Sequence, residues 1–359
     1  MLYQKGQAVY NEINDQPRLW RETLNRLASG REAIQGWLRG ENFGQVVFLG
    51  SGSAYNVALT AARITHRVSG LNAVPLSSSE MLYLNRPPYD PRIKTLLVPM
   101  SRQGETSETL WAVEKLRKMN PPCKAMALSV VNGALSSLCD QTFRLDGCEE
   151  FGPVATKSAS CMLLTSIVLG CFLAQGKADA LLHEVNRVPE MLDPKAVADR
   201  VRGIGQLKPQ PQHAVFLGSG AYLGLAAEGA LKMREMVGIP GEYQQPLEYR
   251  HGSHCGLTNL NFVVALVSDT LRNFEEECLT FISQSRAPRF VICEEASQTM
   301  RRSEFVVELK SGLSELSRML VSLVYLQLMC YYLSIAKGVN PDKPKLMEQP
   351  LVLKDKPSF

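Results

Sequence analysis

The stretch SRQGETSET, from Ser101 to Thr109, gathers the most side chains that could do chemistry. It follows a run typical of a buried strand, opens a run typical of a helix, and offers hydroxyls, an amide and a glycine. Hydroxyls and the N–H groups at a helix start can wrap a phosphate without a metal. The same hydroxyls could instead only cap the helix. We therefore expect a phosphate-binding loop here, with a simple helix cap as the alternative.

A second group of reactive side chains lies in EGALKMRE, where Glu228, Lys232 and Glu235 share one side of a predicted helix. Such a set is often a solvated charged stripe. This helix, however, begins behind a glycine turn where helices are packed, and buried carboxylates and amines need partners or a task. His251 and His254 follow in a loop with glycine. A histidine and a carboxylate facing a phosphate pocket would form an acid/base pair.

The elements that must position these groups are marked by one repeated sequence, FLGSG, which occupies residues 48–52 and again 216–220. Apolar and β-branched residues lead into each copy, and a stretch of helical character follows it. Glycines permit a tight turn that exposes N–H groups to an anion. The third glycine of a dinucleotide-binding fingerprint is missing from both copies, so a nucleotide cofactor is not supported.

The chain continues in parallel after both copies of FLGSG. Further strands are predicted at residues 95–101, 123–130 and 141–146 in the first half, and at 261–268, 288–294 and 304–310 in the second. Helices are predicted at 16–27, 107–119, 160–175 and 316–337. Strands that alternate with helices predict an α/β fold, a parallel sheet with helices on both faces. We divide the chain into domains at 1–195 and 196–359, with a boundary region at 193–212 marked by charge and by LKPQPQ.

Composition excludes several classes of function. The net charge of +4 comes without a basic block, which gives no support to nucleic-acid binding. Nine cysteines without a CxxC pair suggest reduced thiols rather than a disulfide framework or a zinc site. The first residues show no signal-peptide core. Residues 319–336 are about long enough to span a membrane, but Gln327 and two tyrosines favour a helix buried in a core. We expect a cytoplasmic protein with no membrane partner.

Taken together, the motifs resemble the double sugar-isomerase (SIS) family. That family includes the isomerase half of glutamine–fructose-6-phosphate amidotransferase, amino-sugar-phosphate deaminases and deglycases of phosphorylated Amadori compounds. FLGSGSAYN resembles the family's first strand-turn, SRQGETSET its SxSGET phosphate loop, and FGPVATKSAS its VAST-K segment. EGALKMRE followed by RHG resembles the EGALKLKE…KHG signature. The resemblance covers nearly the whole chain and implies two tandem SIS domains, each a flavodoxin-like or Rossmann-like three-layer sandwich.

The resemblance also implies roles for single residues. Glu235 would be the base that moves a proton between C1 and C2 of an open-chain sugar. His251 would help to open the ring or protonate an oxygen, and in the family it often comes from the partner subunit. Glu228 would be a supporting carboxylate. The phosphate would be held by Ser53, Ser101, Gln103 and Thr106. The rest of the pocket would be lined by Ser51, Arg102, Ala155 and Thr156.

Departures from the family pattern narrow the reaction. Arg102 and Gln103 stand where the amidotransferase has Gln and Ser, Ala54 replaces a serine, and RHGSHC replaces the usual HGP. Gln349 stands where some relatives place an imine-forming lysine, with Lys345 and Lys354 out of register.

Without that lysine, enolisation still works on a substrate that carries its own nitrogen. We therefore predict a phosphosugar enzyme that needs no cofactor and no metal. It would cleave a carbon–nitrogen bond in an amino-sugar or ketosamine phosphate, as a deaminase or deglycase, or perform aldose–ketose isomerisation. The alternative is a non-catalytic sugar-phosphate-binding regulator. A shared active site predicts a homodimer or a larger homo-oligomer.

Overall fold

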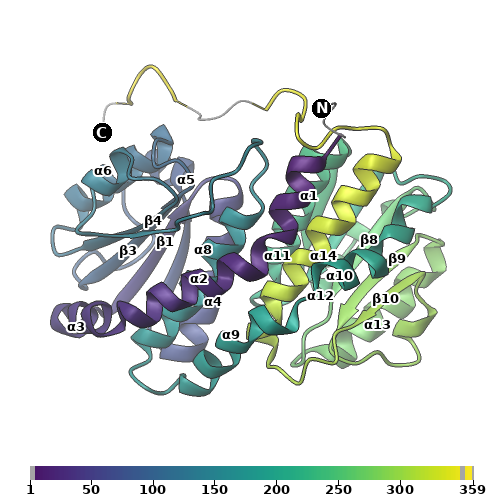
Figure 1. The fold of residues 1–359 in the computed structure, drawn as a ribbon, viewed down its shortest axis with the longest axis horizontal. Helices are drawn as coiled ribbons and strands as arrows, with labels where there is room; N and C mark the ends of the chain where they lie inside the picture. Colours follow the sequence, from purple (N-terminus) through teal and green to yellow (C-terminus); the bar gives the residue numbers. More distant parts are fainter. Residues whose placement is uncertain (1–4, 348–351, 358–359) are drawn as a thin grey trace. The chain divides into compact units, whose positions relative to one another are not determined.

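The computed structural model describes residues 5–347 and 352–357, which pack as two compact units (Figure 1). The first, here called the N-unit, contains residues 16–150, 157–189 and 352–357. The second, the C-unit, contains residues 5–15, 151–156 and 190–347. The domain boundary at residue 195, drawn from the sequence, stays a prediction. The packing changes unit between Pro189 and Glu190, and two short segments from the first half of the chain join the C-unit.

The N-unit is built on a five-stranded parallel sheet in the order β2-β1-β3-β4-β5. Its strands are β1 (Gln45–Gly50), β2 (Asn72–Ser77), β3 (Thr95–Ser101), β4 (Lys124–Ser129) and β5 (Gln141–Arg144). Strands β1 and β3 are buried along their whole length, as expected for the centre of a parallel sheet.

Helices cover both faces of this sheet. They are α2 (Gln16–Ser29), α3 (Arg31–Glu41), α4 (Ser53–Ser69), α5 (Ser78–Tyr83), α6 (Ser107–Met119), α7 (Ala134–Ser137), α8 (Lys157–Leu173) and α9 (Asp179–Met191), which ends in the C-unit. Helices α4, α8 and α2 pack together, and α5, α6 and α7 form a second group with a core that includes Val47, Leu97 and Leu116.

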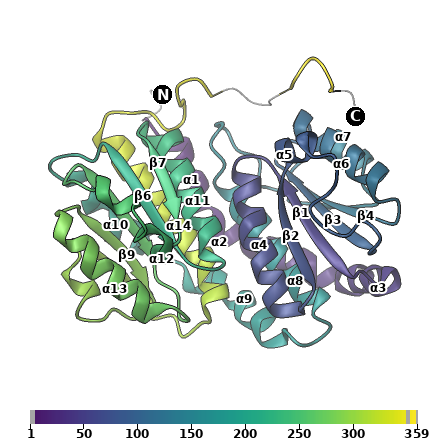
Figure 2. The ribbon, with the colours of Figure 1, turned by 180° about the vertical axis from the view of Figure 1, so that it is seen from behind.

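The C-unit repeats the plan with the parallel sheet β7-β6-β8-β9-β10 (Figure 2). Its strands are β6 (His213–Gly218), β7 (Gly241–Gln244), β8 (Asn261–Leu266), β9 (Arg289–Cys293) and β10 (Phe305–Glu308). Its helices are α1 (Gln7–Asn14), α10 (Pro194–Val201), α11 (Tyr222–Lys232), α12 (Pro246–Tyr249), α13 (Arg272–Ile282) and α14 (Glu315–Ala336). Short 3-10 turns lie at Arg202–Gln206, Ser253–Gly256, Ser283–Ser285 and Met300–Arg302, and a π-helical turn at Met233–Val237.

Helix α14 is the apolar segment that the sequence placed in a core. By length and composition it is the one helix of the described residues that could cross a membrane. However, 78% of its most apolar window is buried inside the protein, where it packs against α11, α10 and α1. The prediction of a core helix is confirmed. Residues 193–212, where we placed a boundary, contain α10 and a 3-10 turn that pack on α14.

The predicted strands are confirmed to within two residues at either end, but two strands were missed. Both β2 and β7 are edge strands that follow the helix after an FLGSG turn, α4 and α11 respectively. Strand β2, NAVPLS, contains a proline and is mostly half-exposed, and β7, GEYQ, is short and polar. Edge strands need not be apolar on both faces, so neither carries the signal of a buried strand.

Candidate functional site

In each FLGSG turn, the backbone at both glycines is one that only glycine accommodates easily. A Cβ on Gly50 would lie 2.6 Å from the backbone carbon of Ala54, and one on Gly218 would lie 2.6 Å from the backbone oxygen of Tyr222. The helix after each strand therefore returns too close for any side chain. The second glycines, Gly52 and Gly220, have φ of 57° and 56°, in the left-handed region that favours glycine.

The first turn presents a serine to the space beyond the sheet. The hydroxyl of Ser51 is buried, and no described residue gives it a hydrogen-bond partner. Ser53, the next predicted phosphate ligand, is the first residue of α4. A helix start next to a buried hydroxyl without a protein partner is an arrangement that suits an anion.

The second part of the predicted phosphate site is the loop that ends β3. Ser101 is 4% exposed, and its hydroxyl accepts a hydrogen bond from the Gly104 N–H at 3.1 Å. The hydroxyls of Ser101 and Thr106 lie 3.1 Å apart. Gly104 has φ of 66°, which allows the tight turn. Serine, glycine and threonine thus form a closed loop at the carboxyl end of a central strand.

The helix-cap alternative can be tested at Thr106, the N-cap residue of α6. Its hydroxyl makes no hydrogen bond to the helix and instead contacts Ser101. Two neighbouring hydroxyls are used inside the protein: that of Thr109 contacts Ser78 at 3.0 Å, and that of Ser107 accepts from the Leu353 N–H at 2.9 Å. The loop is therefore held by its own side chains and does not act as a side-chain cap.

Two loop residues differ in how firmly they are held. The Arg102 guanidinium lies 2.7 Å from a carboxylate oxygen of Glu150, whose side chain is fully buried. Glu150 also accepts from the N–H and hydroxyl of Ser158 at 3.1 and 2.7 Å, in the first turn of α8. Gln103 is half-buried. Arg102 is thus fixed to the start of α8 through a residue that the sequence analysis did not single out.

The C-unit holds the predicted acid/base cluster. The Lys232 ammonium, fully buried, lies 3.0 Å from Glu228 and 2.5 Å from Glu235. The Glu228 side chain is 3% exposed and that of Glu235 is 13% exposed. The three residues therefore do not form a solvated stripe. Burial disfavours the ammonium, but the two carboxylates outweigh it and raise the pKa of Lys232 above its ordinary value.

Glu235 lies where the helix changes its winding. Helix α11 ends at Lys232, the π-helical turn Met233–Val237 follows, and Gly238 ends it with φ of 74°. Such wide turns are rare and concentrate at functional sites. Here the widened turn brings Glu235 onto Lys232 while leaving this carboxylate the most accessible of the three charges.

Helix α14 and the segment 151–156 lie behind this cluster within the C-unit. The Gln327 amide donates to the Thr156 carbonyl at 3.2 Å. Cys330 is buried beside Lys232, and burial raises the pKa of its thiol. Thr156, predicted to line the pocket, is fully buried, and Ala155 is half-buried.

The two histidines of the loop after α12 have different surroundings. His251 is exposed, with its backbone N–H bonded to the Glu248 carbonyl at 2.9 Å. His254 is half-buried, with Nδ1 3.3 Å from the Tyr249 carbonyl and its ring edge-on to Phe281 at 4.6 Å. His254 is therefore part of the local packing, while His251 is accessible for chemistry.

The predicted site residues fall into two groups. Ser51, Ser53, Ser101, Arg102, Gln103 and Thr106 belong to the N-unit, and Ala155, Thr156, Glu228, Glu235 and His251 belong to the C-unit. Lys232 was visible in the helical spacing but was not included among the predicted site residues. Among the described residues, no group of three or more His, Cys, Asp or Glu is arranged to hold a metal ion.

Comparisons with known proteins bear on this arrangement. Residues 41–170 match the family model of the SIS domain. The chain is 27% identical over 351 residues to the glutamine–fructose-6-phosphate aminotransferase (isomerizing) of Thermococcus kodakarensis, covering 94% of this chain and 56% of that protein. The chain thus spans about half the length of the curated relatives it matches.

Solved structures match both units. The glucosamine-6-phosphate deaminase of Thermotoga maritima has a TM-score of 0.79 at 24% identity and covers 97% of this chain and 100% of its own. The tagatose-6-phosphate ketose/aldose isomerase of Escherichia coli has a TM-score of 0.83 at 22% identity, covering 96% and 99%. The predicted fold, two units that each contain a parallel sheet flanked by helices, is confirmed.

Proposed function

We propose that this double SIS-domain protein is an enzyme that binds a sugar 6-phosphate and moves a proton between C1 and C2 of its open-chain form. The observation that carries the proposal is Glu235, a partly exposed carboxylate in a π-helical turn, held against a buried ammonium. A general base must lie within reach of substrate, and Glu235 is the most exposed of the three charged groups in this cluster.

The phosphate would bind to the N-unit. The buried Ser51 hydroxyl, the start of α4 and the closed loop Ser101–Thr106 would supply hydroxyl and N–H donors. The names of the relatives support this class of substrate, because they refer to fructose 6-phosphate, glucosamine 6-phosphate and tagatose 6-phosphate.

The finer reaction that we propose is cleavage of a carbon–nitrogen bond. In a 2-amino aldose phosphate, Glu235 would remove the C2 proton to form an enolamine, and protonation at C1 would give an imine at C2. Water would hydrolyse that imine to ketose phosphate and ammonia. In a ketosamine phosphate the proton would leave C1, protonation at C2 would give an imine at C1, and hydrolysis would release the amine. Either route uses the nitrogen of the substrate and needs no lysine imine.

Two further predictions belong to this proposal. Gln349, at the position of the family's imine-forming lysine, lies outside the described residues. His251, the predicted ring-opening acid, is exposed on its loop, so a neighbouring subunit could use it. A homo-oligomer with shared active sites remains our proposal for the assembly.

The test follows proton exchange directly. The protein would be incubated in heavy water with glucosamine 6-phosphate, galactosamine 6-phosphate, fructoselysine 6-phosphate or glucoselysine 6-phosphate, and proton NMR recorded. We expect amine release, or deuterium at C1 or C2, with at least one substrate. Glu235→Gln should lower turnover by about 10²–10⁴-fold and keep binding. Glu242→Gln, on the exposed part of β7, is the matched control.

Two results would contradict the proposal. Unchanged turnover in Glu235→Gln would remove the assigned base. Binding of these sugar phosphates without exchange or amine release would instead favour the non-catalytic regulator.

A further inference from the structure

The C-unit contains its own version of the strand-end loop. Ser268 follows β8 and is followed by Leu271 and then α13, just as Ser101 ends β3 and is followed by Gly104 and then α6. In both loops the serine hydroxyl accepts from the N–H three residues later, at 3.1 Å for Gly104 and 3.0 Å for Leu271. The same backbone device therefore ends a central strand in both halves of the chain.

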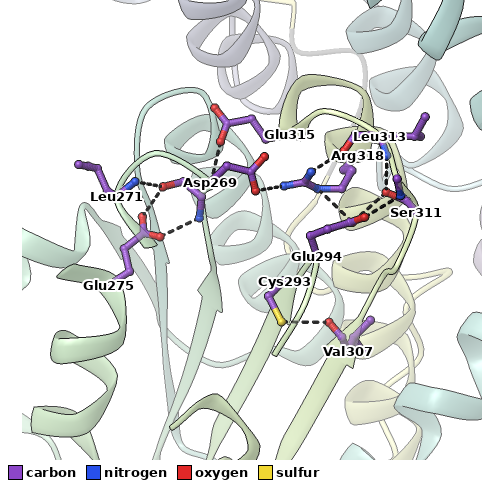
Figure 3. Close-up of polar contacts among 12 residues, drawn as sticks. Asp269, Leu271, Glu275, Cys293, Glu294, Val307, Ser311, Leu313, Glu315 and Arg318 are labelled. Atoms are coloured by element: carbon purple, nitrogen blue, oxygen red, sulfur yellow. Dashed lines mark hydrogen bonds and ion pairs between the residues drawn. The ribbon is translucent and has the colours of Figure 1, made fainter. Parts of the chain in front are cut away.

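The hydrogen-bond donors of the second loop bind carboxylates of the protein itself. Glu275 accepts from the Ser268 N–H at 2.7 Å and from the Ser268 hydroxyl at 3.1 Å. Glu315, at the start of α14, accepts from the Asp269 N–H at 2.9 Å. Figure 3 shows both carboxylates converging on this loop, Glu275 from α13 and Glu315 from α14. Glu275 is 3% exposed and Glu315 6%.

The hydrogen-bond donors and acceptors of the first loop, at the end of β3, have different partners. The Ser101 hydroxyl contacts the Thr106 hydroxyl and the Gly104 N–H, and within the described residues no carboxylate accepts from either group. A carboxylate and a phosphate need the same donors, since both are anions that bind N–H groups and hydroxyls. In the described residues the two loops thus differ in whether a carboxylate accepts hydrogen bonds from the strand-end serine.

A buried arginine pairs with two further acid groups beside this loop. Arg318, 2% exposed, contacts Asp269 and lies 3.5 Å from Glu294. Glu294 also accepts from the Ser311 hydroxyl and the Gly312 N–H, at 2.8 and 2.7 Å (Figure 3). Burial raises the pKa of Glu275, and the hydrogen bonds from the Ser268 N–H and hydroxyl oppose this rise. The buried hydroxyl of Ser219, in the second FLGSG turn, has no hydrogen-bond partner among the described residues, so the strand-end loop is what holds this carboxylate.

We propose that the Glu275 side chain is a built-in anion, which occupies the place at the end of β8 that a phosphate would take at the end of β3. The loop Ser268–Leu271 is an anion site that the chain closes to outside ligands with its own carboxylate. The comparison of the loops rests on the phosphate-binding role proposed for the N-unit. The occupation of the second loop rests on the hydrogen bonds of Glu275 alone.

The test is chemical rescue of Glu275→Ala. Removal of the carboxylate exposes the Ser268 donors, so formate or inorganic phosphate should fill the site and stabilise the folded state. At ten times the dissociation constant, we expect the Tm of the variant to rise by about 2–4 °C more than that of the wild type. Glu276→Ala is the matched control, because Glu276 is the next residue of α13 and pairs with Arg272 at 3.1 Å.

A second variant and a second measurement keep the test decisive. Glu275→Gln retains an oxygen for the Ser268 donors and should show no added response to either anion. If Glu275→Ala folds poorly, the yield of refolding with and without formate replaces the Tm as the readout.

A response in Glu275→Ala no larger than in the wild type or in Glu276→Ala would overturn the proposal. A wild type that fails to bind sugar phosphates would contradict the proposed function instead, and it would leave the rescue result intact.

Discussion

At the scale of single residues, we expect the largest loss of stability on substitution of Lys232. Its ammonium is the shared partner of two buried carboxylates. Lys232→Met leaves both acids without that charge, and loss of one partner of a buried ion pair costs about 3–5 kcal/mol. We expect urea unfolding to show a loss of this size. In Arg18→Met, which breaks an exposed pair with Glu22, the loss should be below about 1 kcal/mol.

The pH dependence of this effect has a definite sign. The pKa of Lys232 is raised in the folded protein, so the stability from its ammonium is fully present below the ordinary lysine pKa. It is lost only as the pH rises through the raised value. The difference in stability between the wild type and Lys232→Met should therefore not decrease through neutral pH. A difference that shrinks between pH 6 and 8 would show that the ammonium is not the stabilising group.

Residue-level reasoning from the sequence had a clear limit at this cluster. The spacing of Glu228, Lys232 and Glu235 was visible, but helical spacing alone could not decide between a solvated stripe and a buried triad. The π-helical turn decides between the solvated stripe and the buried triad. No residue type in MREMV predicts such a turn. Glu150 was missed for a similar reason, because its partners Arg102 and Ser158 come together only through the fold.

At the scale of elements, the two FLGSG turns should fail in the same way when their first glycine is replaced. Gly50→Ala and Gly218→Ala each place a methyl group 2.6 Å from backbone atoms of the following helix. We expect each to cost about 1–3 kcal/mol, as overpacking does. Gly36→Ala, in α3 with no atom within 4 Å of its added Cβ, should instead raise stability by about 0.5–1 kcal/mol. Equal behaviour of the three variants in urea unfolding would contradict this account.

The contact between the β3 loop and α8 gives a second expectation at this scale. Glu150→Gln weakens the ion pair with Arg102. This should make the phosphate loop less firmly held and leave the chemical step unchanged. Within the proposed function, we expect KM for the sugar phosphate to rise about 10-fold, or about 1.4 kcal/mol, with kcat little changed. Glu149→Gln, one residue earlier and exposed, is the control. A fall in kcat with KM unchanged would show that Glu150 does not act through binding.

Sequence patterns predicted the central strands and one edge strand of each sheet, β5 and β10, and missed the other edge strand, β2 and β7. Strands β1, β3, β6 and β8 are apolar runs buried on both faces, so composition alone was enough to find them. Strands β2 and β7 pair on one side only, and their polar or proline-containing sequences have no such constraint. Residues 151–156 belong to the C-unit although they lie in the first half of the chain. No local sequence pattern predicts this, because it depends on packing against distant segments.

At the scale of the whole molecule, the proposed sharing of His251 between subunits can be tested by mixing inactive variants. Glu235→Gln and His251→Asn should each be inactive alone. In a mixed dimer, one active site would have both wild-type residues. Random mixing of a symmetric dimer should therefore restore about a quarter of the wild-type activity. No recovery in mixtures that demonstrably exchange subunits would place both residues in the same chain.

The packing of α1 against α14 has a consequence for synthesis on the ribosome. The Val9 N–H donates to Asp342 at 2.9 Å, and the Gly6 N–H donates to Asn340 at 3.0 Å. At translation speeds of 5–20 residues per second, α1 is made roughly 15 to 65 seconds before α14. During that interval the apolar side of α1, with Val9 and Ile13, lacks α14 as a partner, although α10, which it also contacts, is made earlier. The nascent chain therefore presents a binding segment for chaperones until its last long helix emerges.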